Sequence, residues 1–172
     1  YVNLDIEDYP DQASIYKKAQ SLKINDIDKK YGRGKIIDEI YKVHVRPHII
    51  NPLFMIDHPV ELSPLAKQKE SDARYVERTQ LLCVGGNELC NGFSELNDPL
   101  EQEQRFKEQE RLSEAGDDES MPYDADFVTA LKHGMPPTAG LGMGIDRLIK
   151  LLTNSKNLKE VILFPTLKNQ SL

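Results

Sequence analysis

The sequence contains no tryptophan and only two cysteines, Cys83 and Cys90, in 172 residues. So few thiols exclude a fold held together by disulfides and favour a reducing compartment, and we therefore expect a cytoplasmic protein. No apolar run approaches the roughly 20 residues that a membrane-spanning helix needs, and the first residues lack the basic-then-apolar pattern of a signal peptide. Because Tyr1 falls in what reads as running sequence, we expect a fragment of a longer protein.

The chain also lacks an excess of basic residues, since its net charge is −6. Proteins that bind nucleic-acid backbones in general carry basic surfaces, so a binder of that kind is not expected. The charge does not exclude an enzyme that meets a nucleic acid only at one end. The length and the hydrophobic content are typical of one soluble globular domain.

What the chain does contain is a clear set of helix signals. Ile15, Ala19 and Leu22 recur at helical spacing. Pro47 disfavours helix in the residue before it, which ends a second helical segment near Arg46. Caps and apolar stripes predict helices over 11–24, 35–45, 98–116, 126–134 and 145–153.

The third of these helices is the best marked. Asp98 can cap its start, Glu101 completes a capping box, and Gly116 can end it. Most of its side chains are charged, so we expect it on the surface.

Short apolar runs predict the strands. Buried strands are expected over 53–56, 79–84 and 161–165. The pair Gly85-Gly86 predicts a turn into a further strand. Strands and helices do not alternate regularly, which argues against a doubly wound parallel sheet. The expected fold is therefore α+β, with an antiparallel β-sheet flanked by helices.

The first segment with a chemical pattern is GLGMGIDRL, residues 140–148. Gly140, Gly142 and Gly144 alternate, so one edge of the segment has no side chains and a flat ligand can approach the backbone. A helix begins directly afterwards, and its free N–H groups favour a phosphate. Arg147 in its first turn adds a fixed positive fork for a phosphate or an adenine face. The alternative is a glycine-rich strand end beside an ordinary exposed arginine.

The second segment, NELCNGFSELNDP, allows two interpretations. Its central Asn-Gly pair is a strong hairpin signal, which would set Glu88 opposite Glu95, an unfavourable pairing of like charges. In one extended strand, Asn91, Phe93 and Glu95 share a face that suits a cationic, hydrogen-bonding ligand such as an ammonium group. Glu88 has the other parity and needs a bulge to join that face. A solvated polar strand face is the alternative without a ligand.

Two further groups carry less chemistry. The loop HPVELSPLAK holds His58, Ser63 and Lys67, but no acid that could orient a nucleophile is identifiable, so catalysis is not expected there. The acidic residues within 117–126 lack the glycine and the ligand order of a calcium loop. Helix capping and solvation are expected of them instead.

Taken together, these segments resemble the class II lysyl-tRNA synthetases in order and spacing. The resemblance runs from about Tyr31 to Leu167, and the combination of ELNDP, AGDDE and PPTAGLGMGIDR is specific to the lysine enzymes. The last of these segments resembles motif 3 of the class II enzymes. The resemblance implies a lysine–tRNA ligase, which activates lysine with ATP to lysyl-adenylate and transfers it to tRNA(Lys).

The resemblance also implies roles for individual residues. Glu88 matches a carboxylate that holds Mg²⁺ bridging the ATP phosphates, and Arg147 matches the arginine that lies against the ATP; these two are the expected catalytic residues. Glu95 is expected to pair with the ε-ammonium group of lysine, which favours the extended strand over the hairpin. The expected lysine pocket comprises Asn91, Phe93, Glu95, Gly142 and Gly144, and the expected ATP site comprises Glu88, Asn91, Gly144 and Arg147.

The resemblance further implies that residues 1–172 are the C-terminal portion of a class II catalytic domain. Residues 1–50 would be a mostly helical insertion or connection, and residues 51–172 would carry the sheet, motif 3 and the final helix. The family's motifs 1 and 2, its dimer contacts and its anticodon-binding domain are not in the chain, so we expect it alone to be inactive, although the intact enzyme is a homodimer. Lysine-dependent ATP–pyrophosphate exchange by the chain alone, above a Glu95→Ala control, would contradict this expectation.

One position departs from the family. A second metal-binding glutamate usually stands seven positions before Glu88, where this chain has Leu81 with Gln80 beside it. Glutamine can offer one oxygen ligand, so the second metal position stays open. The departure favours one alternative function, a catalytically dead synthetase-like binding protein. A lysyltransferase paralogue that modifies a translation factor is the other alternative.

Overall fold

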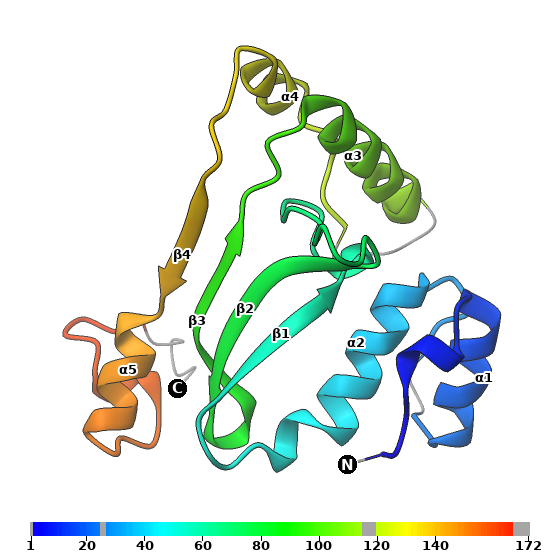
Figure 1. The fold of residues 1–172 in the computed structure, drawn as a ribbon. Coiled ribbons are helices and arrows are strands. Elements are labelled where there is room, and N and C mark those ends of the chain that lie inside the picture. The colour runs from blue at the N-terminus through cyan, green and yellow to red at the C-terminus, as the bar shows by residue number, and fades with distance from the viewer. Residues whose placement is uncertain (1, 25–26, 115–119, 167–172) are drawn as a thin grey trace, which may run out of the picture.

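The computed structural model describes residues 2–24, 27–114 and 120–166. Its centre is one four-stranded sheet in the order β1-β2-β3-β4, and all neighbouring strands are antiparallel (Figure 1). The strands are β1 Leu53–Pro59, β2 Tyr75–Cys83, β3 Asn87–Ser94 and β4 Ala139–Met143. Together with the flanking helices, this sheet confirms the predicted α+β fold.

All five predicted helices are confirmed, with ends that differ by a few residues. They are α1 Gln12–Ser21, α2 Arg33–His44, α3 Pro99–Glu114, α4 Ala125–Lys132 and α5 Ile145–Leu152. The predicted end of α3 at Gly116 lies outside the described residues. No helix in the described ranges is both long enough and apolar enough to cross a membrane.

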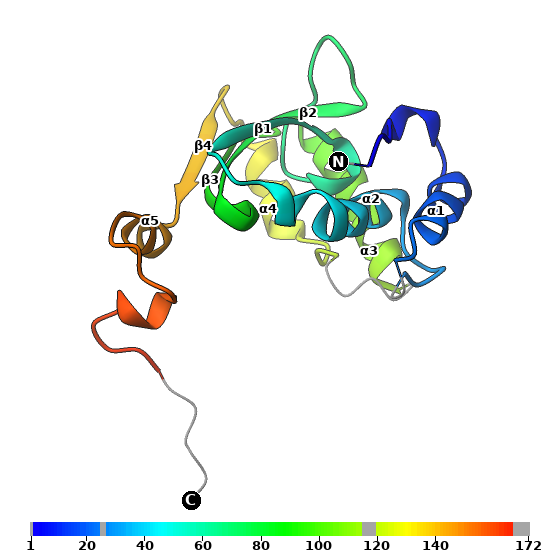
Figure 2. The ribbon, with the colours of Figure 1, turned by 90° about the horizontal axis from the view of Figure 1, so that it is seen from below.

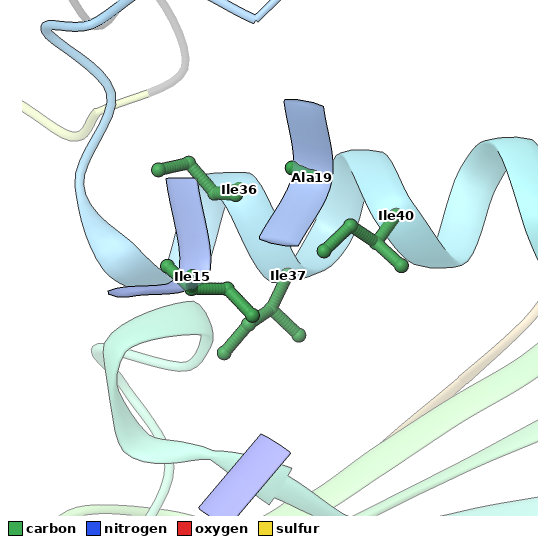
Figure 3. Packing of buried hydrophobic residues seen from close by; sticks show 5 residues of the cluster. All are labelled: Ile15, Ala19, Ile36, Ile37 and Ile40. Atoms are coloured by element: carbon green, nitrogen blue, oxygen red, sulfur yellow. The ribbon is translucent and has the colours of Figure 1, made fainter. Parts of the chain in front are cut away.

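The first two helices pack together through an aliphatic cluster. Ile15 and Ala19 of α1 and Ile36 of α2 have no exposed surface, and Ile37 and Ile40 of α2 complete the cluster (Figure 3). Ile15 and Ala19 are positions that the helical spacing marked, and burial of one apolar stripe from each helix holds the pair together. Figure 2 shows α2 and α3 on one side of the sheet.

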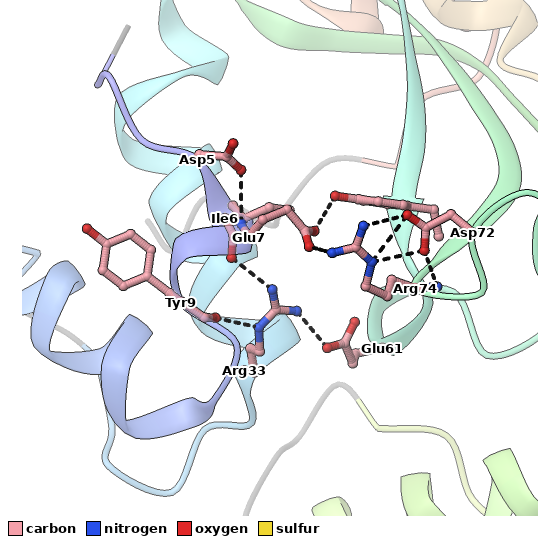
Figure 4. A network of polar contacts seen from close by, with 9 residues as sticks. Asp5, Ile6, Glu7, Tyr9, Arg33, Glu61, Asp72 and Arg74 are labelled. Carbon is pink, nitrogen blue, oxygen red and sulfur yellow. Dashed lines mark hydrogen bonds and ion pairs between the residues drawn. The ribbon is translucent and has the colours of Figure 1, made fainter.

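An arginine ties the N-terminal segment to the rest of the molecule. The Arg33 guanidinium donates to the backbone carbonyls of Tyr9 at 2.8 Å and Ile6 at 3.0 Å. It also pairs with Glu61, at 2.7 Å, in the connection between β1 and β2 (Figure 4). One planar side chain with several fixed donors therefore joins three separate segments.

Further buried residues lie in the sheet, among them Val76 and Leu82 of β2, and between α3 and α4. Phe106 of α3 is buried and meets Phe127 of α4 edge to face, with ring centroids 6.0 Å apart. The predicted cap is confirmed, because the Asp98 carboxylate accepts from Leu100 N at 2.8 Å. The predicted capping box is wrong, since Glu101 pairs with Arg105 one turn later instead.

The predicted buried strand over 161–165 is wrong. The segment is irregular, and Leu163 and Phe164 are 89% and 92% exposed. A strand needs a neighbour for its backbone hydrogen bonds, and no described segment pairs with this one. The apolar stripe of α5 is likewise open to solvent, with Ile145 and Leu152 58% and 76% exposed. The apolar sequence predicted a buried strand over 161–165 and an apolar stripe on the last helix, and the described residues supply no surface to cover either of them.

Candidate functional site

The site is organised by a bulge in β3. The strand continues in one extended piece through Asn91, so the extended interpretation is confirmed and the hairpin is wrong. The register of β2 against β3 shifts between Leu81 and Leu82, which leaves Leu89 as an extra residue in β3. Because of this extra residue, Glu88 turns to the same sheet face as Asn91, as the sequence pattern required.

A hollow of about 480 Å³ lies on this face, along β3, β4 and the start of α5. Every residue that the sequence assigned to the site lines it: Glu88, Asn91, Phe93, Glu95, Gly142, Gly144 and Arg147. Arg147, in the first turn of α5, donates to the backbone carbonyl of Glu88 at 2.8 Å. Residues separated by 59 positions in the chain are thereby held at one edge of the hollow.

The glycines of β4 form the open floor of the hollow. Gly140 and Gly142 pair with Phe93 and Asn91 of β3. A Cβ atom at Gly140 would collide with the carboxylate of Glu95, so this glycine makes room for that side chain. A Cβ at Gly142 would meet only the Asn91 carbonyl, at 3.9 Å, so the space above Gly142 is free for a ligand.

Glu95 stands at the other end of β3 from Glu88. It is partly buried, and burial raises its pKa. Its backbone N–H donates to Thr138 O at 2.9 Å, but within the described ranges its carboxylate makes no hydrogen bond or ion pair. A half-buried carboxylate without a partner favours a ligand that brings a positive charge.

Arg78 of β2 is a site residue that the sequence analysis missed. It is half-buried, and its Nε donates to Asn91 Oδ1 at 3.0 Å while its Nη1 donates to Ser63 Oγ at 2.9 Å. The predicted strand began at residue 79, but β2 begins at Tyr75. Two-residue alternation counted back from Gln80 would have placed Arg78 on the same face.

Gln80, and not Leu81, faces Glu88. Gln80 lies opposite Asn91, and its amide donates to the Glu88 carboxylate, whereas Leu81 belongs to the other face of the sheet. The Oε1 atom of Gln80 meets His58 Nε2 at 2.9 Å. The departure from the family pattern is therefore a substitution of an amide beside Glu88.

The predicted loop around His58 is partly wrong. His58 and Pro59 end β1, an edge strand where proline is tolerated, and a single 3-10 turn follows over Val60–Leu62. His58 is buried, and burial lowers its pKa, which favours the neutral imidazole. The backbone N–H of Lys67 donates to the backbone oxygen of Ser94 in β3 at 2.8 Å. Through these bonds the group supports the sheet.

A second hollow of about 500 Å³ opens between α2 and the same sheet face. It shares Glu88 and Arg147 with the first hollow, so the two meet at that pair. Its lining carries charges of both signs, from Lys42, Arg46 and Arg78 on the basic side and from Asp38 and Glu88 on the acidic side. This wall suits a phosphate chain accompanied by a cation.

The described residues contain no group of three or more His, Cys, Asp or Glu side chains that could hold a metal ion. Residues 117–119 of the acidic segment lie outside the described ranges. Asp124 accepts from Phe127 N at 2.9 Å and caps α4, as expected of a capping residue. A cation at Glu88 would therefore need ligands from a substrate. Mg²⁺ is commonly held in this way, by one or two carboxylates, waters and substrate phosphates.

Comparison with known proteins places the sequence in a family. Residues 6–168 match the family model described as tRNA synthetases class II (D, K and N). The chain is 47% identical over 171 residues to a lysine–tRNA ligase of Dehalococcoides mccartyi, which covers 99% of the chain and 34% of that protein. It is 45% identical over 166 residues to the lysine–tRNA ligase of Serratia proteamaculans, covering 96% of the chain and 32% of that protein. The chain thus spans about a third of the length of these relatives. The family model matches most of the chain and the fold is consistent with it, so the chain belongs to the class II tRNA synthetases of the D, K and N group.

Proposed function

We propose that the protein carrying this chain is a lysine–tRNA ligase, which activates lysine with ATP and transfers it to tRNA(Lys). The observation that supports this most is the shared hollow, in which the unpaired carboxylate of Glu95 and the guanidinium of Arg147 line one cavity. The relatives named as lysine–tRNA ligases agree with lysine as the substrate. They give no support to a translation-factor lysyltransferase or a silent binding protein.

At the amino-acid end, Glu95 would receive the ε-ammonium group of lysine. Its carboxylate is partly buried and has no partner among the described side chains, so an ammonium group would complete its hydrogen bonding. The Phe93 ring and the Asn91 amide line the same hollow and would pack along the ligand. A neutral or shorter side chain would leave the carboxylate unpaired, which is how such a site discriminates between amino acids.

At the nucleotide end, Arg147 and the glycine backbone of β4 would hold ATP. The guanidinium is fixed by the Glu88 carbonyl and can still offer its remaining donors to a phosphate or its plane to adenine. The reaction is an in-line attack of the lysine carboxylate on the α-phosphate, with pyrophosphate leaving. Such a reaction needs positioning and charge neutralisation more than covalent help.

Glu88 would hold the Mg²⁺ that accompanies the nucleotide. The fit rests on its place where the two hollows meet, beside the basic wall that would take the phosphates. When bound, the ion would neutralise phosphate charge. Homodimer formation and a cytoplasmic location belong to the same proposal and rest on the family alone.

The test is to measure amino-acid-dependent ATP–pyrophosphate exchange with the full-length protein that carries this chain. We expect exchange with lysine, a loss of about a hundredfold or more in Glu95→Gln, and little change in Glu77→Gln. Glu77 is a matched control because it is an exposed carboxylate on the other face of β2. Exchange that depends on aspartate or asparagine instead of lysine would overturn the proposed substrate. If none of the amino acids supports exchange, the proposed activity is overturned.

A further inference from the structure

Glu88 is held from two sides. Arg147 binds its backbone carbonyl, and Gln80 donates a side-chain hydrogen bond to its carboxylate. Gln80 is in turn bonded to His58, so a polar chain runs from β1 through β2 to β3. His58 is 7% exposed and begins this chain in the interior of the protein.

The chemistry of the three groups fixes the direction of every bond in this chain. An ionised carboxylate can only accept, so the amide nitrogen of Gln80 must point to Glu88. The amide oxygen is then turned to His58, whose Nε2 must carry the proton and donate it, over 2.9 Å. Rotating the amide would set its oxygen against the carboxylate, a repulsion that neither tautomer of His58 could relieve. The chain therefore has one favourable arrangement.

This arrangement turns the Gln80 oxygen away from Glu88. The oxygen, the atom that could ligate a cation, points to buried His58, and the nitrogen that faces Glu88 has no lone pair to offer a cation. Gln80 is also neutral, so the wall where the two hollows meet carries a single carboxylate on the β2–β3 pair. One carboxylate at this wall suits one protein-bound cation that takes its remaining ligands from phosphate and water.

We propose that Gln80 is a positioning residue, which aims the Glu88 carboxylate at the nucleotide's divalent cation and does not ligate that cation itself. The inference rests on the proposed function, because it takes the nucleotide and its cation as occupants of these hollows. Loss of an outer hydrogen-bond partner usually weakens metal binding by about 10–100-fold while leaving the ligand in place. Loss of a ligand removes the ion.

The experiment counts bound Mn²⁺ by electron paramagnetic resonance, in the encoded protein saturated with a non-hydrolysable ATP analogue. Gln80→Leu is expected to keep the wild-type number of ions per site and to bind the weakest of them about tenfold less tightly. Glu88→Gln is expected to hold one ion fewer, and Gln80→Glu, which adds a second carboxylate, one ion more. Gln104→Glu, an exposed position on α3, controls for the added charge. Gln80→Met serves as the second apolar variant if Gln80→Leu does not fold.

The possible outcomes are distinct. Loss of an ion in Gln80→Leu or Gln80→Met, as in Glu88→Gln, would make Gln80 a ligand and overturn the inference. An unchanged ion number in Gln80→Glu would overturn it as well. If the wild-type protein binds no Mn²⁺ together with the nucleotide, the proposed function itself fails, whatever the variants do.

Discussion

Glu95 is a residue at which ligand binding and folding stability oppose each other. Burial raises the pKa of its carboxyl group, so ionisation costs stability at pH values above that raised pKa, and the cost disappears as the pH falls below the usual pKa of glutamate. Glu95→Gln is therefore expected to raise the thermal unfolding midpoint near neutral pH, with no gain in acid. Lysine affinity should fall as the pH falls through the raised pKa. Thermal scans at both pH values and calorimetric lysine titration measure this, and a lower midpoint at neutral pH would contradict it.

Substitutions at two glycines on neighbouring strands are expected to affect lysine binding and folding stability separately. Alanine at Gly140 would meet the end of the Glu95 side chain, which can rotate away. Gly140→Ala should thus fold normally and bind lysine about tenfold or more weakly, because a displaced carboxylate no longer meets the ammonium group. Alanine at Gly92 would lie 2.9 Å from the backbone oxygen of Gly140, which cannot move without disturbing the β3–β4 pair. Gly92→Ala should cost about 1–3 kcal/mol of unfolding free energy. Equal unfolding free energies for the two variants would refute this contrast.

At the scale of the element, the start of α3 depends on one side chain. Asp98 accepts hydrogen bonds from Leu100 N at 2.8 Å and from Glu101 N at 3.3 Å. Asp98→Ala is expected to lower the free energy of unfolding by about 1 kcal/mol, and Asp98→Asn by much less, since asparagine caps nearly as well. Urea denaturation compares the two. A similar loss in both variants would show that the charge, rather than the cap, matters.

Elements whose signals are local were predictable. The cap at Asp98 and the proline after α2 depend on neighbouring residues alone, and both helices form as expected. The prediction of a strand over 161–165 was wrong because a strand also needs a partner strand, and composition does not reveal one. The seven site residues were assigned by resemblance, and they share one hollow. Arg78 and Gln80 were missed or left open, because their roles depend on the register between two strands.

At the scale of the whole molecule, Arg33 connects the N-terminal segment to the segment between β1 and β2, and Glu7 adds a second polar connection through Arg74 and Tyr75 (Figure 4). Arg33→Ala would leave the carbonyls of Ile6 and Tyr9 without this donor, and it is expected to cost about 1–3 kcal/mol. Arg33→Lys should restore only part of that, because an ammonium group lacks the planar fork. Urea denaturation gives the free energy, and limited proteolysis reports whether the first residues detach. An unchanged proteolysis pattern in Arg33→Ala would count against this role.

The described residues leave one of the two faces of the sheet uncovered. Phe54, Ile56 and Leu141 lie on the face away from the hollow and are 68%, 60% and 69% exposed. A sequence of alternating residues predicts which side chains share a face, but not whether that face is covered. The division of the chain into residues 1–50 and 51–172 stays a prediction, although both α1 and α2 lie in the first part.

Because of the extra residue in β3, the face on which Glu88 lies depends on the number of residues between Glu88 and Asn91 more than on which residues they are. Leu89 reverses the alternation for Glu88 and also accepts from Gly144 N at 2.9 Å, just before α5. Removing one residue there would send the acidic group to the opposite surface while Asn91 stayed in place. Homologues that lack one residue in this short stretch should therefore lose the carboxylate from the hollow and with it the activity. Exchanges among aliphatic residues at position 89 should change the activity little.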